Sequence, residues 1–359
     1  MDPTLANRYW TIRLAEAAEL ESLLALVRSL PGERYQGASS EYWQWRYLND
    51  AGFAATIVAA VHDGQLIGVQ PVSFFDWQWG DVRLTGAMYT GVVTHPDHRR
   101  KGVFRSLIDA SNDLAAQRGA QFCMTLPNDA SLPGFLKFGD WKYPGCIPMW
   151  MKVLDGGKLL ASKIGPLGRL VGWIPDLLFS RRSRSNGSAA IELAATASVS
   201  TELEAVSERF ARLAGGCMIR RTAAYWNWRH SGPLSMYRTL IAGKNGRLVG
   251  AICTTSQPRM GVEIGLIVDV VAEDSQVLRA LIAAADTEFR RLGCAIATCQ
   301  STSLILNDAL REEGYRLPPR AVMPKQFHFV YRPTGVPGLP REPASMNDWH
   351  LTFGDSDNV

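Results

Sequence analysis

Apolar side chains recur at two different spacings along this chain of 359 residues. Between positions 103 and 114 they return every three or four residues, which is the period of an α-helix with one buried face. They alternate with polar residues around Asp-Gly at 63–64 and Asn-Gly at 245–246, and each pair predicts a β-hairpin with a type I′ turn. The mixture of amphipathic helices and alternating strands predicts an α/β fold of the α+β kind.

The same order of segments occurs twice along the chain. Tyr-Trp-x-Trp-Arg occupies residues 42–46 and returns at 225–229, 183 positions later, and the predicted hairpins lie 182 positions apart. Leu107 in the first long helix matches Leu281 at a spacing of 174. Such nearly constant spacing indicates a duplicated domain. Each copy is predicted as strand, helix, hairpin, strand, long helix, strand, short helix and final strands.

These patterns divide the chain into four predicted segments. A first domain spans residues 1–155 and a second spans 189–335, each a mixed, twisted sheet flanked by helices. Residues 156–188 form an apolar arm and a basic linker, which we interpret as packing on the domains. An anionic membrane surface is the alternative partner for this arm, because apolar and basic residues adjoin there. The C-terminal tail, residues 336–359, alternates aromatic with other residues and is predicted to pack back on the body.

Composition narrows the classes of function. Hydrophobic residues make up 47% and charged residues 20% of the chain, as in soluble globular proteins. A net charge of +4 with scattered basic residues does not indicate a nucleic-acid partner. Six cysteines without paired ligand spacing predict free, mostly buried thiols and no metal site. The chain shows neither a signal peptide nor a membrane-spanning apolar run, so we expect a cytoplasmic protein.

One loop has a distinctive chemistry. Residues 91–105 are predicted as a strand end, a basic turn with glycine, and a helix start. Free N–H groups and the positive end of the helix dipole favour a phosphate there, and Gly102 leaves the backbone open to it. The side chains that would hold further phosphate charge are Arg99, Arg100, Lys101 and Arg105.

This loop resembles the coenzyme-A-binding motif of the GNAT acyltransferase superfamily, Arg/Gln-x-x-Gly-x-Gly/Ala. Arg99 and Gly102 match it, whereas Phe104 departs from it at the last small position. The family's later segment, Asn-x-x-Ser/Ala-x-x-x-Tyr/Phe-x-x-x-Gly, is matched by Asn128, Ser131, Phe135 and Gly139. The resemblance implies acetyl-CoA, or another acyl-CoA, as cosubstrate. Its contacts are expected at Val92, Val93, Arg99, Arg100, Lys101, Gly102, Val103, Phe104, Asn128, Ser131 and Phe135.

The second copy lacks this loop. Glu273 stands at the position of Arg99, and Gln276 replaces Gly102. Acidic side chains at a helix start suit the dipole as caps but repel a pyrophosphate. The following helix keeps its apolar face, so the second copy is predicted to fold like the first without binding coenzyme A. Its expected roles are to wall the substrate cleft and to stabilise the first copy.

The resemblance implies direct transfer of an acyl group to an amine. We expect an acetyl group to move to a primary amine of a small molecule, an amino sugar being one possibility. Backbone N–H groups near Val92 and Val93 would polarise the thioester oxygen. Many family members place a tyrosine acid where this chain has Phe135, and the predicted central strand, residues 87–94, carries no carboxylate. Proton handling is therefore assigned to Tyr89 on that strand, the substitutes being His95, Asp97, His98, Cys123, Tyr143 and the tail carboxylates.

Two features leave alternatives open. Because Phe135 has no proton to give, a non-catalytic coenzyme-A-binding or scaffolding module is the alternative function. The repeated Tyr-Trp-x-Trp-Arg motif is interpreted either as an aromatic lining for an acceptor or as core packing. Its survival in the copy without the basic loop favours core packing.

Overall fold

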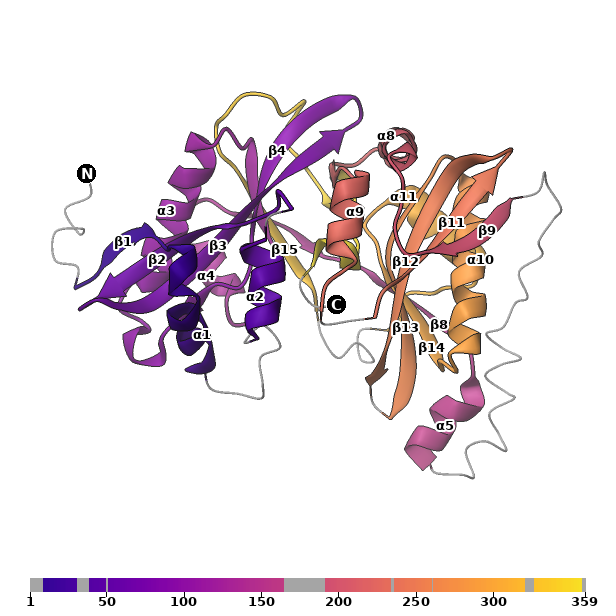
Figure 1. Cartoon of the computed structure of the whole chain (residues 1–359), viewed down its shortest axis with the longest axis horizontal. Coiled ribbons are helices and arrows are strands. Elements are labelled where there is room, and N and C mark those ends of the chain that lie inside the picture. Colours follow the sequence, from indigo (N-terminus) through magenta and orange to yellow (C-terminus); the bar gives the residue numbers. More distant parts are fainter. Residues whose placement is uncertain are drawn as a thin grey trace. The chain divides into compact units, whose positions relative to one another are not determined.

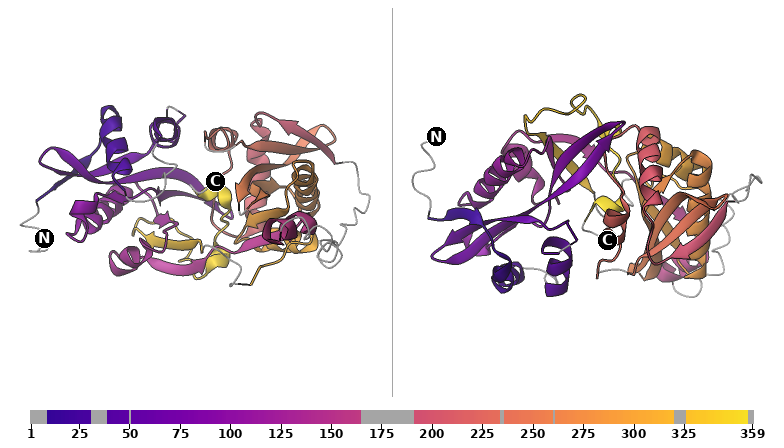
Figure 2. Two further views of the ribbon diagram at one scale, coloured as in Figure 1. Left: turned by 90° about the horizontal axis from the view of Figure 1, so that it is seen from below. Right: turned by 45° about the horizontal axis from the view of Figure 1, so that its top comes forward.

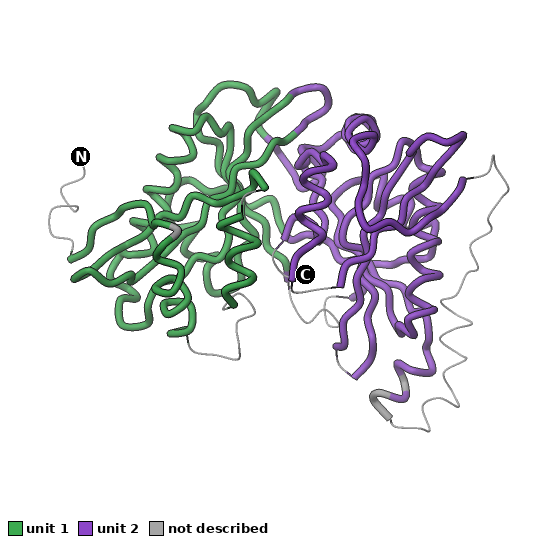
Figure 3. Tube along the Cα trace, viewed as in Figure 1, with its two compact units in different colours: residues 1–77, 83–145, 327–342 green, residues 78–82, 146–326, 343–359 purple. Residues whose placement is uncertain are grey.

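The computed structural model describes residues 9–30, 39–49, 51–164, 191–233, 236–259, 261–319 and 326–356. Two compact units make up the chain, coloured green and purple in Figure 3. Unit 1 contains residues 1–77, 83–145 and 327–342, and unit 2 contains residues 78–82, 146–326 and 343–359. Each has its own sheet with helices packed on it, so the predicted α+β fold with two similar domains is confirmed.

The sheet of unit 1 runs in the order β1-β2-β3-β4-β6-β15-β7. β4 and β6 are parallel neighbours, whereas β15 runs antiparallel to β6. A short strand, β5 (Val93–Thr94), pairs with β3 beyond the end of β4. The main strands are β1 (Thr11–Leu14), β2 (Thr56–His62), β3 (Gln65–Trp79), β4 (Val82–Tyr89), β6 (Phe122–Thr125), β7 (Lys142–Cys146) and β15 (His328–Pro333).

Helices cover both faces of this sheet. α1 and α2 lie on one face and α3 on the other (Figure 2, left). α4 shares the α3 side, because Leu107 of α3 and Phe135 of α4 belong to one buried cluster with Tyr89 of β4. The helices are α1 (Leu20–Arg28), α2 (Ser40–Tyr47), α3 (Val103–Gln117) and α4 (Leu132–Lys137), with the 3-10 turns η2 (Ala17–Glu19) and η4 (Pro96–His98).

Unit 2 repeats the plan, with the sheet order β8-β14-β13-β12-β11-β9. β13 and β14 are parallel, as β4 and β6 are in unit 1. The strands of this sheet are β8 (Met149–Val153), β9 (Glu192–Thr196), β11 (Arg238–Lys244), β12 (Arg247–Arg259), β13 (Val262–Ala272) and β14 (Ile296–Gln300). The short strand β10 (Met218–Ile219) pairs with β3 instead. The helices are α5 (Gly156–Ile164), α8 (Glu202–Ala214), α9 (Ala223–Arg229), α10 (Ser275–Arg291) and α11 (Leu304–Glu312), with the 3-10 turns η7 (Met346–Asp348) and η8 (Phe353–Asp355).

Both predicted type I′ turns are present. Such a turn needs a positive φ at both central residues. The angle is +48° at Asp63 and +77° at Gly64. In the second copy it is +54° at Asn245 and +71° at Gly246. The turn chemistry therefore sets the register of the two central hairpins.

The strand predicted over residues 87–94 is interrupted, which corrects the sequence interpretation. β4 ends at Tyr89 and β5 begins at Val93, with Gly91 at φ +58° between them. A left-handed residue turns the chain out of the extended region, so regular pairing does not continue through it. Because apolar residues run on through the break, the hydrophobic pattern does not reveal it.

The two units exchange a strand. β15 follows unit 2 in sequence but lies in unit 1, between β6 and β7. β8 follows unit 1 in sequence but lies in unit 2, where Met151 also pairs with Arg316. In Figure 1 the exchange appears as an orange strand within the purple sheet and a magenta strand within the orange sheet.

This exchange displaces the predicted domain boundaries. Residues 146–155 belong to unit 2, not to a first domain ending at 155, and residues 327–335 belong to unit 1. The tail is divided between the units at residue 343. Of the predicted arm and linker, residues 156–164 form α5, and residues 165–188 lie outside the described residues. Local patterns identify a strand but not its partner, and these partners are far away in sequence.

The repeated Tyr-Trp-x-Trp-Arg motif lies on α2 in unit 1 and on α9 in unit 2. Ser39 caps the first of these helices and Thr222 the second, each by accepting a hydrogen bond from the N–H of the motif's tyrosine. Trp43 and Trp226 are buried, at 2% and 1% exposure. Buried rings of this kind pack in the core and do not line an open surface, as the structural interpretation of the motif expects.

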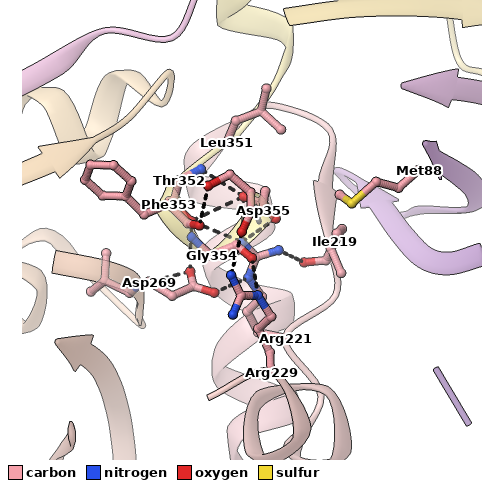
Figure 4. A network of polar contacts seen from close by, with 12 residues as sticks. Met88, Ile219, Arg221, Arg229, Asp269, Leu351, Thr352, Phe353, Gly354 and Asp355 are labelled. Atoms are coloured by element: carbon pink, nitrogen blue, oxygen red, sulfur yellow. Dashed lines mark hydrogen bonds and ion pairs between the residues drawn. The ribbon is translucent and has the colours of Figure 1, made fainter. Parts of the chain in front are cut away.

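The tail of unit 2 encloses a buried charge network (Figure 4). Arg221 donates to Asp269 on β13 at 2.8 Å and to Asp355 in the tail at 2.9 Å, and all three side chains are fully buried. Burial raises the pKa of Asp269 to about 6, although the Arg221 charge opposes this shift. Arg229 of α9 donates to the backbone carbonyls of Gly354 and Ser356. Within unit 2 the tail is therefore part of the core.

A second buried ion pair holds the exchanged strand β8 in unit 2. Lys152 on β8 pairs with Asp286 on α10, and it donates to the Glu313 carbonyl at 2.6 Å. Tyr315 donates to the other oxygen of Asp286 at 2.6 Å. Burial raises the pKa of Asp286, and the Lys152 charge partly offsets that shift. The ion pair thus joins β8 to a helix that arrives more than 100 residues later.

We predict that Lys152→Met lowers the free energy of unfolding of unit 2 by about 3–5 kcal/mol at neutral pH, because Asp286 is left buried without its cation. The folded pKa of Asp286 already lies above its unfolded value, and losing Lys152 raises it further. Protonation then favours the folded state, so the defect shrinks at low pH and grows as the pH rises through the folded pKa. Chemical denaturation at several pH values measures both effects.

The matched control is the double variant Lys152→Met/Asp286→Asn, which removes the buried charge as well. It should recover part of the lost stability. An unfolding free energy for Lys152→Met within about 0.5 kcal/mol of the wild type, the range of an ordinary surface substitution, would contradict the anchoring role.

Candidate active site

The parallel strands at the centre of unit 1 stop pairing at one level. Tyr89 of β4 pairs with Thr125 of β6, and the Thr125 hydroxyl donates to the Tyr89 carbonyl at 2.7 Å. Beyond this row β4 is broken and β6 has ended. In open α/β sheets, ligands bind at the carboxyl ends of the parallel strands, where neighbouring connections diverge.

Gln70 on β3 holds the chain at this break. Its amide nitrogen donates to the carbonyl of Pro71 at 2.8 Å and to that of Thr90 at 3.1 Å. Two buried oxygens beside it, Gln70 Oε1 and Thr90 Oγ1, have no hydrogen-bond partner among the described residues. Buried polar atoms without a partner need a ligand or water to satisfy them. Neither residue was predicted as a site residue, because a single polar residue in an apolar strand is an unspecific signal.

The predicted phosphate loop lies directly after β5. The first intrahelical bond of α3 runs from the Ser106 N–H to the Gly102 carbonyl, so the N–H groups before Ser106 precede the helical ladder. Gly102 has φ +96° and is exposed, which leaves this backbone accessible. A Cβ there would stand 3.8 Å from the Trp10 ring, so backbone conformation, not lack of space, requires glycine.

The basic side chains of this loop are available at the surface. Arg99, Arg100 and Lys101 are exposed, and Arg99 Nε donates to the Thr94 carbonyl at 3.3 Å. Arg105, one turn into α3, forms an ion pair with Asp109 at 3.5 Å. An exposed helix start with a left-handed glycine and adjacent cations fits the pyrophosphate of a nucleotide-type cosubstrate.

Three predicted contact residues have buried side chains. Val93 is 4% exposed and Val103 1%, so each would meet a ligand mainly through its backbone N–H. Phe135 is also 1% exposed, and its ring packs edge-on against Trp141 at 5.0 Å. The position that holds a tyrosine acid in many family members is therefore a core position here. Val92, between β4 and β5, is partly exposed.

The packing of Phe104 shows how the structure accommodates a large side chain at the last position of the family motif. Its ring lies 5.3 Å from that of Phe135, edge to face. A Cβ at Gly134 of α4 would come within 2.7 Å of the Phe104 ring, so a glycine on α4 makes room for it. The large side chain at the start of α3 is thus directed at α4, and the backbone beside Gly102 stays open.

Asn128 and Ser131 shape the loop before α4. The Asn128 side-chain oxygen accepts hydrogen bonds from the Ala130 N–H at 3.1 Å and the Ser131 N–H at 2.9 Å. The Ser131 hydroxyl also donates to it, at 3.1 Å. This oxygen is therefore engaged locally, and both residues orient the backbone just beyond the end of β6.

Tyr89 does not suit the proton-handling role that the sequence assigned to it. Its side chain is 1% exposed, and its hydroxyl bonds Asn112 on α3 at 3.0 Å and Cys123 on β6 at 3.2 Å. Burial raises the pKa of Tyr89 well above its ordinary value and that of Cys123 to about 11. Sequence alternation placed Tyr89 on the right strand, but its side chain joins the core beneath α3.

The histidines near the phosphate loop form a group with His62 of β2. The ring of His98 lies 5.2 Å from that of His62 and 5.7 Å from that of His95. Burial lowers the pKa of His98, and the nearby Lys101 adds to the shift. The side chain of His95 accepts from the Asp97 N–H, which caps the 3-10 turn η4. His95 therefore has a capping role at this turn.

Another histidine lies at the end of β6 and was not predicted. His328, the first residue of the exchanged strand β15, contacts Asp129 through Nε2 at 2.7 Å. Its Nδ1 contacts the Tyr143 hydroxyl at 2.8 Å. Tyr143 was among the substitutes, and Asp129 lies inside the quoted motif. The sequence gives no signal for His328, because it stands 185 residues after Tyr143, in a stretch that the repeat assigns to the other copy.

The corresponding places in unit 2 are closed. Glu273 forms ion pairs with Arg209 at 2.9 Å and Arg247 at 2.7 Å, and Asp274 caps α10 by accepting from the Val277 N–H. Beyond the parallel pair β13 and β14, the tail fills the site. Thr302 contacts the Trp349 carbonyl and the Leu351 N–H, and Trp349 is fully buried.

Comparison with known proteins identifies the family of this site. Residues 11–143 match the family model described as an acetyltransferase (GNAT) domain. This chain carries a GNAT acetyltransferase domain. The match covers the strand break, the basic loop and the Asn128 segment. The domain match supports an acyltransferase activity of the GNAT type, and the cosubstrate used by this family is acetyl-CoA.

Solved structures share the fold over both units. A GCN5-related N-acetyltransferase from Anabaena variabilis ATCC 29413 is 15% identical, with a TM-score of 0.65, and 91% of this chain covers 73% of it. A probable N-acyltransferase of unknown function from Enterococcus faecalis V583 is 12% identical at a TM-score of 0.63, with the same coverage. Eis1 from Mycobacterium abscessus is 15% identical, with a TM-score of 0.55. The match covers 91% of this chain and 74% of Eis1. No curated protein sequence matched.

Three further findings concern the described residues. No helix among them is long and apolar enough to cross a membrane. No group of three His, Cys, Asp or Glu side chains in those ranges is placed to hold a metal ion. The six cysteines all lie in these ranges and are free, and all except Cys146 are buried. This confirms the prediction of free, mostly buried thiols.

Proposed function

We propose that this protein transfers an acetyl group from acetyl-CoA directly to the primary amine of a small molecule, an amino sugar being one candidate acceptor. The observation that carries the proposal is the exposed, basic, glycine-bearing start of α3 beside a break in the central strand. Unit 1 has this combination, and the equivalent helix start in unit 2 is acidic and already ion-paired.

The residues present fit the cosubstrate. Backbone N–H groups from Lys101 to Phe104, together with Arg99 and Arg100, would hold its phosphates. The broken edge at Val92 and Val93 would hold the extended pantetheine and direct an N–H group at the thioester oxygen, where one such donor is worth about 3 kcal/mol of barrier. The loop around Asn128 and Ser131 would lie at the thiol end.

The reaction needs few groups from the protein. The neutral amine attacks the thioester carbonyl, a C–N bond forms, the C–S bond breaks, and the sulfur leaves with its electron pair. The ammonium form of the amine cannot attack, so a proton acceptor is needed before this step, and a proton returns to the sulfur after it. Phe135 and Tyr89 are both enclosed in the core and contribute no proton.

A non-catalytic coenzyme-A-binding module is the second candidate. The observation that favours it is the buried phenylalanine at the position where many family members hold an acid. The two functions differ in one measurement. Thiol release from acetyl-CoA with a panel of primary amines, including glucosamine and lysine, supports the transferase, and coenzyme binding without any turnover supports the binding module.

We predict one coenzyme A bound per chain in isothermal titration calorimetry. Unit 2 should contribute no site, because Glu273 occupies the helix start and the tail fills the end of its parallel strands. Two equivalent sites per chain would contradict the assignment of unit 2 as a non-binding copy.

We predict that Gly102→Glu weakens coenzyme A binding by about 10-fold or more. The carboxylate stands at the helix start, where it repels phosphate, and the side chain covers the backbone N–H groups. Calorimetry on the folded variant measures the affinity.

Gly119→Glu is the matched control. Gly119 follows the other end of α3, has φ +74° and has no atom within 4 Å of its Cβ position, so the substitution carries the same charge and a similar backbone strain. Its affinity for coenzyme A should stay close to that of the wild type. Equal affinities for the two variants would remove the phosphate site from this loop.

A further inference from the structure

We propose that Tyr143, backed by His328 and Asp129, accepts the proton of the acceptor amine. This inference rests on the proposed acyltransferase function and assigns the proton acceptor that Tyr89 does not supply. Tyr143 is the catalytic residue in this assignment, and His328 and Asp129 are positioning residues that act through it.

The three side chains form one continuous chain of hydrogen bonds within unit 1. Asp129 Oδ1 lies 2.7 Å from His328 Nε2, and His328 Nδ1 lies 2.8 Å from the Tyr143 oxygen. The imidazole is 7% exposed, whereas Tyr143 is 42% exposed. A buried imidazole with both nitrogens engaged therefore connects to a hydroxyl that solvent and ligands can reach.

The direction of each hydrogen bond follows from which of the groups, the Asp129 carboxylate or the Tyr143 hydroxyl, can donate a proton. An ionised carboxylate can only accept, so Asp129 places the imidazole proton on His328 Nε2. The lone pair of Nδ1 then accepts the hydrogen of Tyr143. This is the order hydroxyl, imidazole, carboxylate, in which the carboxylate holds the imidazole in one tautomer and the imidazole draws a proton from the hydroxyl.

The chain also lies at the correct end of the sheet. Val330 of β15 pairs with Thr125 of β6, so His328, two residues earlier on an antiparallel strand, reaches the level of Pro127. That level lies just past the row where β4 and β6 stop pairing. Asp129 follows Asn128 in the loop assigned to the thiol end of the cosubstrate. Tyr143 itself lies on β7, which follows β15 in the sheet order, two strands beyond β6.

Unit 2 provides an internal comparison. Trp150 of β8 pairs with Cys299 of β14, as Val330 pairs with Thr125 in unit 1. Two residues earlier, just before β8 begins, stands Pro148, at the position of His328. The copy that has lost the basic loop thus also lacks the histidine. Since β15 reaches unit 1 only through the strand exchange, the second half of the chain supplies a residue to the first half's site.

The proton transfer balances as follows. The ammonium of the acceptor gives a proton to the Tyr143 oxygen as the Tyr143 hydrogen moves to His328 Nδ1, which leaves a neutral amine, a neutral tyrosine and an imidazolium beside the Asp129 carboxylate. The amine then attacks the thioester carbon, the C–N bond forms and the C–S bond breaks. The amide nitrogen releases its remaining extra proton to water. A proton from the imidazolium, through Tyr143, or from water converts the departing thiolate to the thiol.

The test compares Tyr143→Phe, His328→Gln and Asp129→Asn with the wild-type full chain. Acetyl-CoA is the donor, glucosamine and lysine are the ammonium-type acceptors, and hydroxylamine is an acceptor that is largely neutral at neutral pH. We expect Tyr143→Phe to lower kcat/KM about 100-fold or more with the ammonium-type acceptors, the usual contribution of a positioned base. With hydroxylamine the loss should be at least 10-fold smaller, because no ammonium has to be deprotonated.

The positioning residues should change the pH dependence. Asp129→Asn removes the negative charge that favours the imidazolium, so the rise of kcat/KM should move to lower pH and its plateau should fall, while coenzyme A affinity stays unchanged. His328→Gln should show the same acceptor dependence as Tyr143→Phe. Tyr331→Phe is the matched control for strand packing, because Tyr331 lies on β15, 2% exposed and stacked on Phe329. It should keep the wild-type pH profile.

The outcomes separate this inference from the proposed function. Wild-type protein that binds coenzyme A without turning over any amine overturns both. Wild-type turnover with unchanged kcat/KM in Tyr143→Phe overturns the proton-acceptor role alone. An equal loss with hydroxylamine and with the ammonium-type acceptors, at an unchanged pH profile, also overturns it and leaves the three residues a structural role. Thermal denaturation and coenzyme A calorimetry on every variant show that the compared proteins are folded.

Discussion

Backbone pairing between distant segments is the constraint on which this structure depends. Neither unit completes its sheet from one continuous stretch, because β6 of unit 1 finds its antiparallel partner in β15 and β14 of unit 2 finds its partner in β8. Each exchanged strand is buried in its host, with Phe329 and Val330 fully enclosed in unit 1 and Lys152 held by a buried ion pair in unit 2. Leaving either place empty would expose apolar side chains and unpaired backbone groups, which is costly in water.

The two copies of the fold share a framework of helices and strands but differ in whether a ligand can reach the site. In unit 1 the helix start after the central strand is basic, open and next to a broken strand edge. In unit 2 the equivalent start is acidic and ion-paired, and the chain's own tail fills the end of the parallel strands. Helix, hairpin and sheet are retained because they form the core, whereas the loop and the tail decide whether a ligand has access. The charge reversal alone disfavours a pyrophosphate in unit 2, and the docked tail reinforces it.

Sequence reasoning succeeded where the information was local. The turns at Asp63 and Asn245 follow from the dipeptides, α3 follows from its apolar period, and the exposed loop around Gly102 follows from a motif that spans a few residues. It failed where the decisive contact was distant or subtle. The break after Tyr89 depends on the conformation of Gly91, the burial of the Tyr89 hydroxyl depends on Asn112 and Cys123, and the partner of Tyr143 lies on β15. Alternation indicates which residues belong to a strand, but not which layer each side chain meets.

By itself, the sequence determined the fold class, the duplication, the two hairpins, and the contrast between a basic and an acidic helix start. Each of these depends on residues close together along the chain, where helix and turn preferences act directly. Only the tertiary structure decided which sheet β8 and β15 join, and therefore where the units begin and end and that His328 stands between Asp129 and Tyr143. Strand pairing is satisfied by any neighbour that offers a free edge and a matching apolar face, so the choice between two similar sheets is made by the packing of the whole chain.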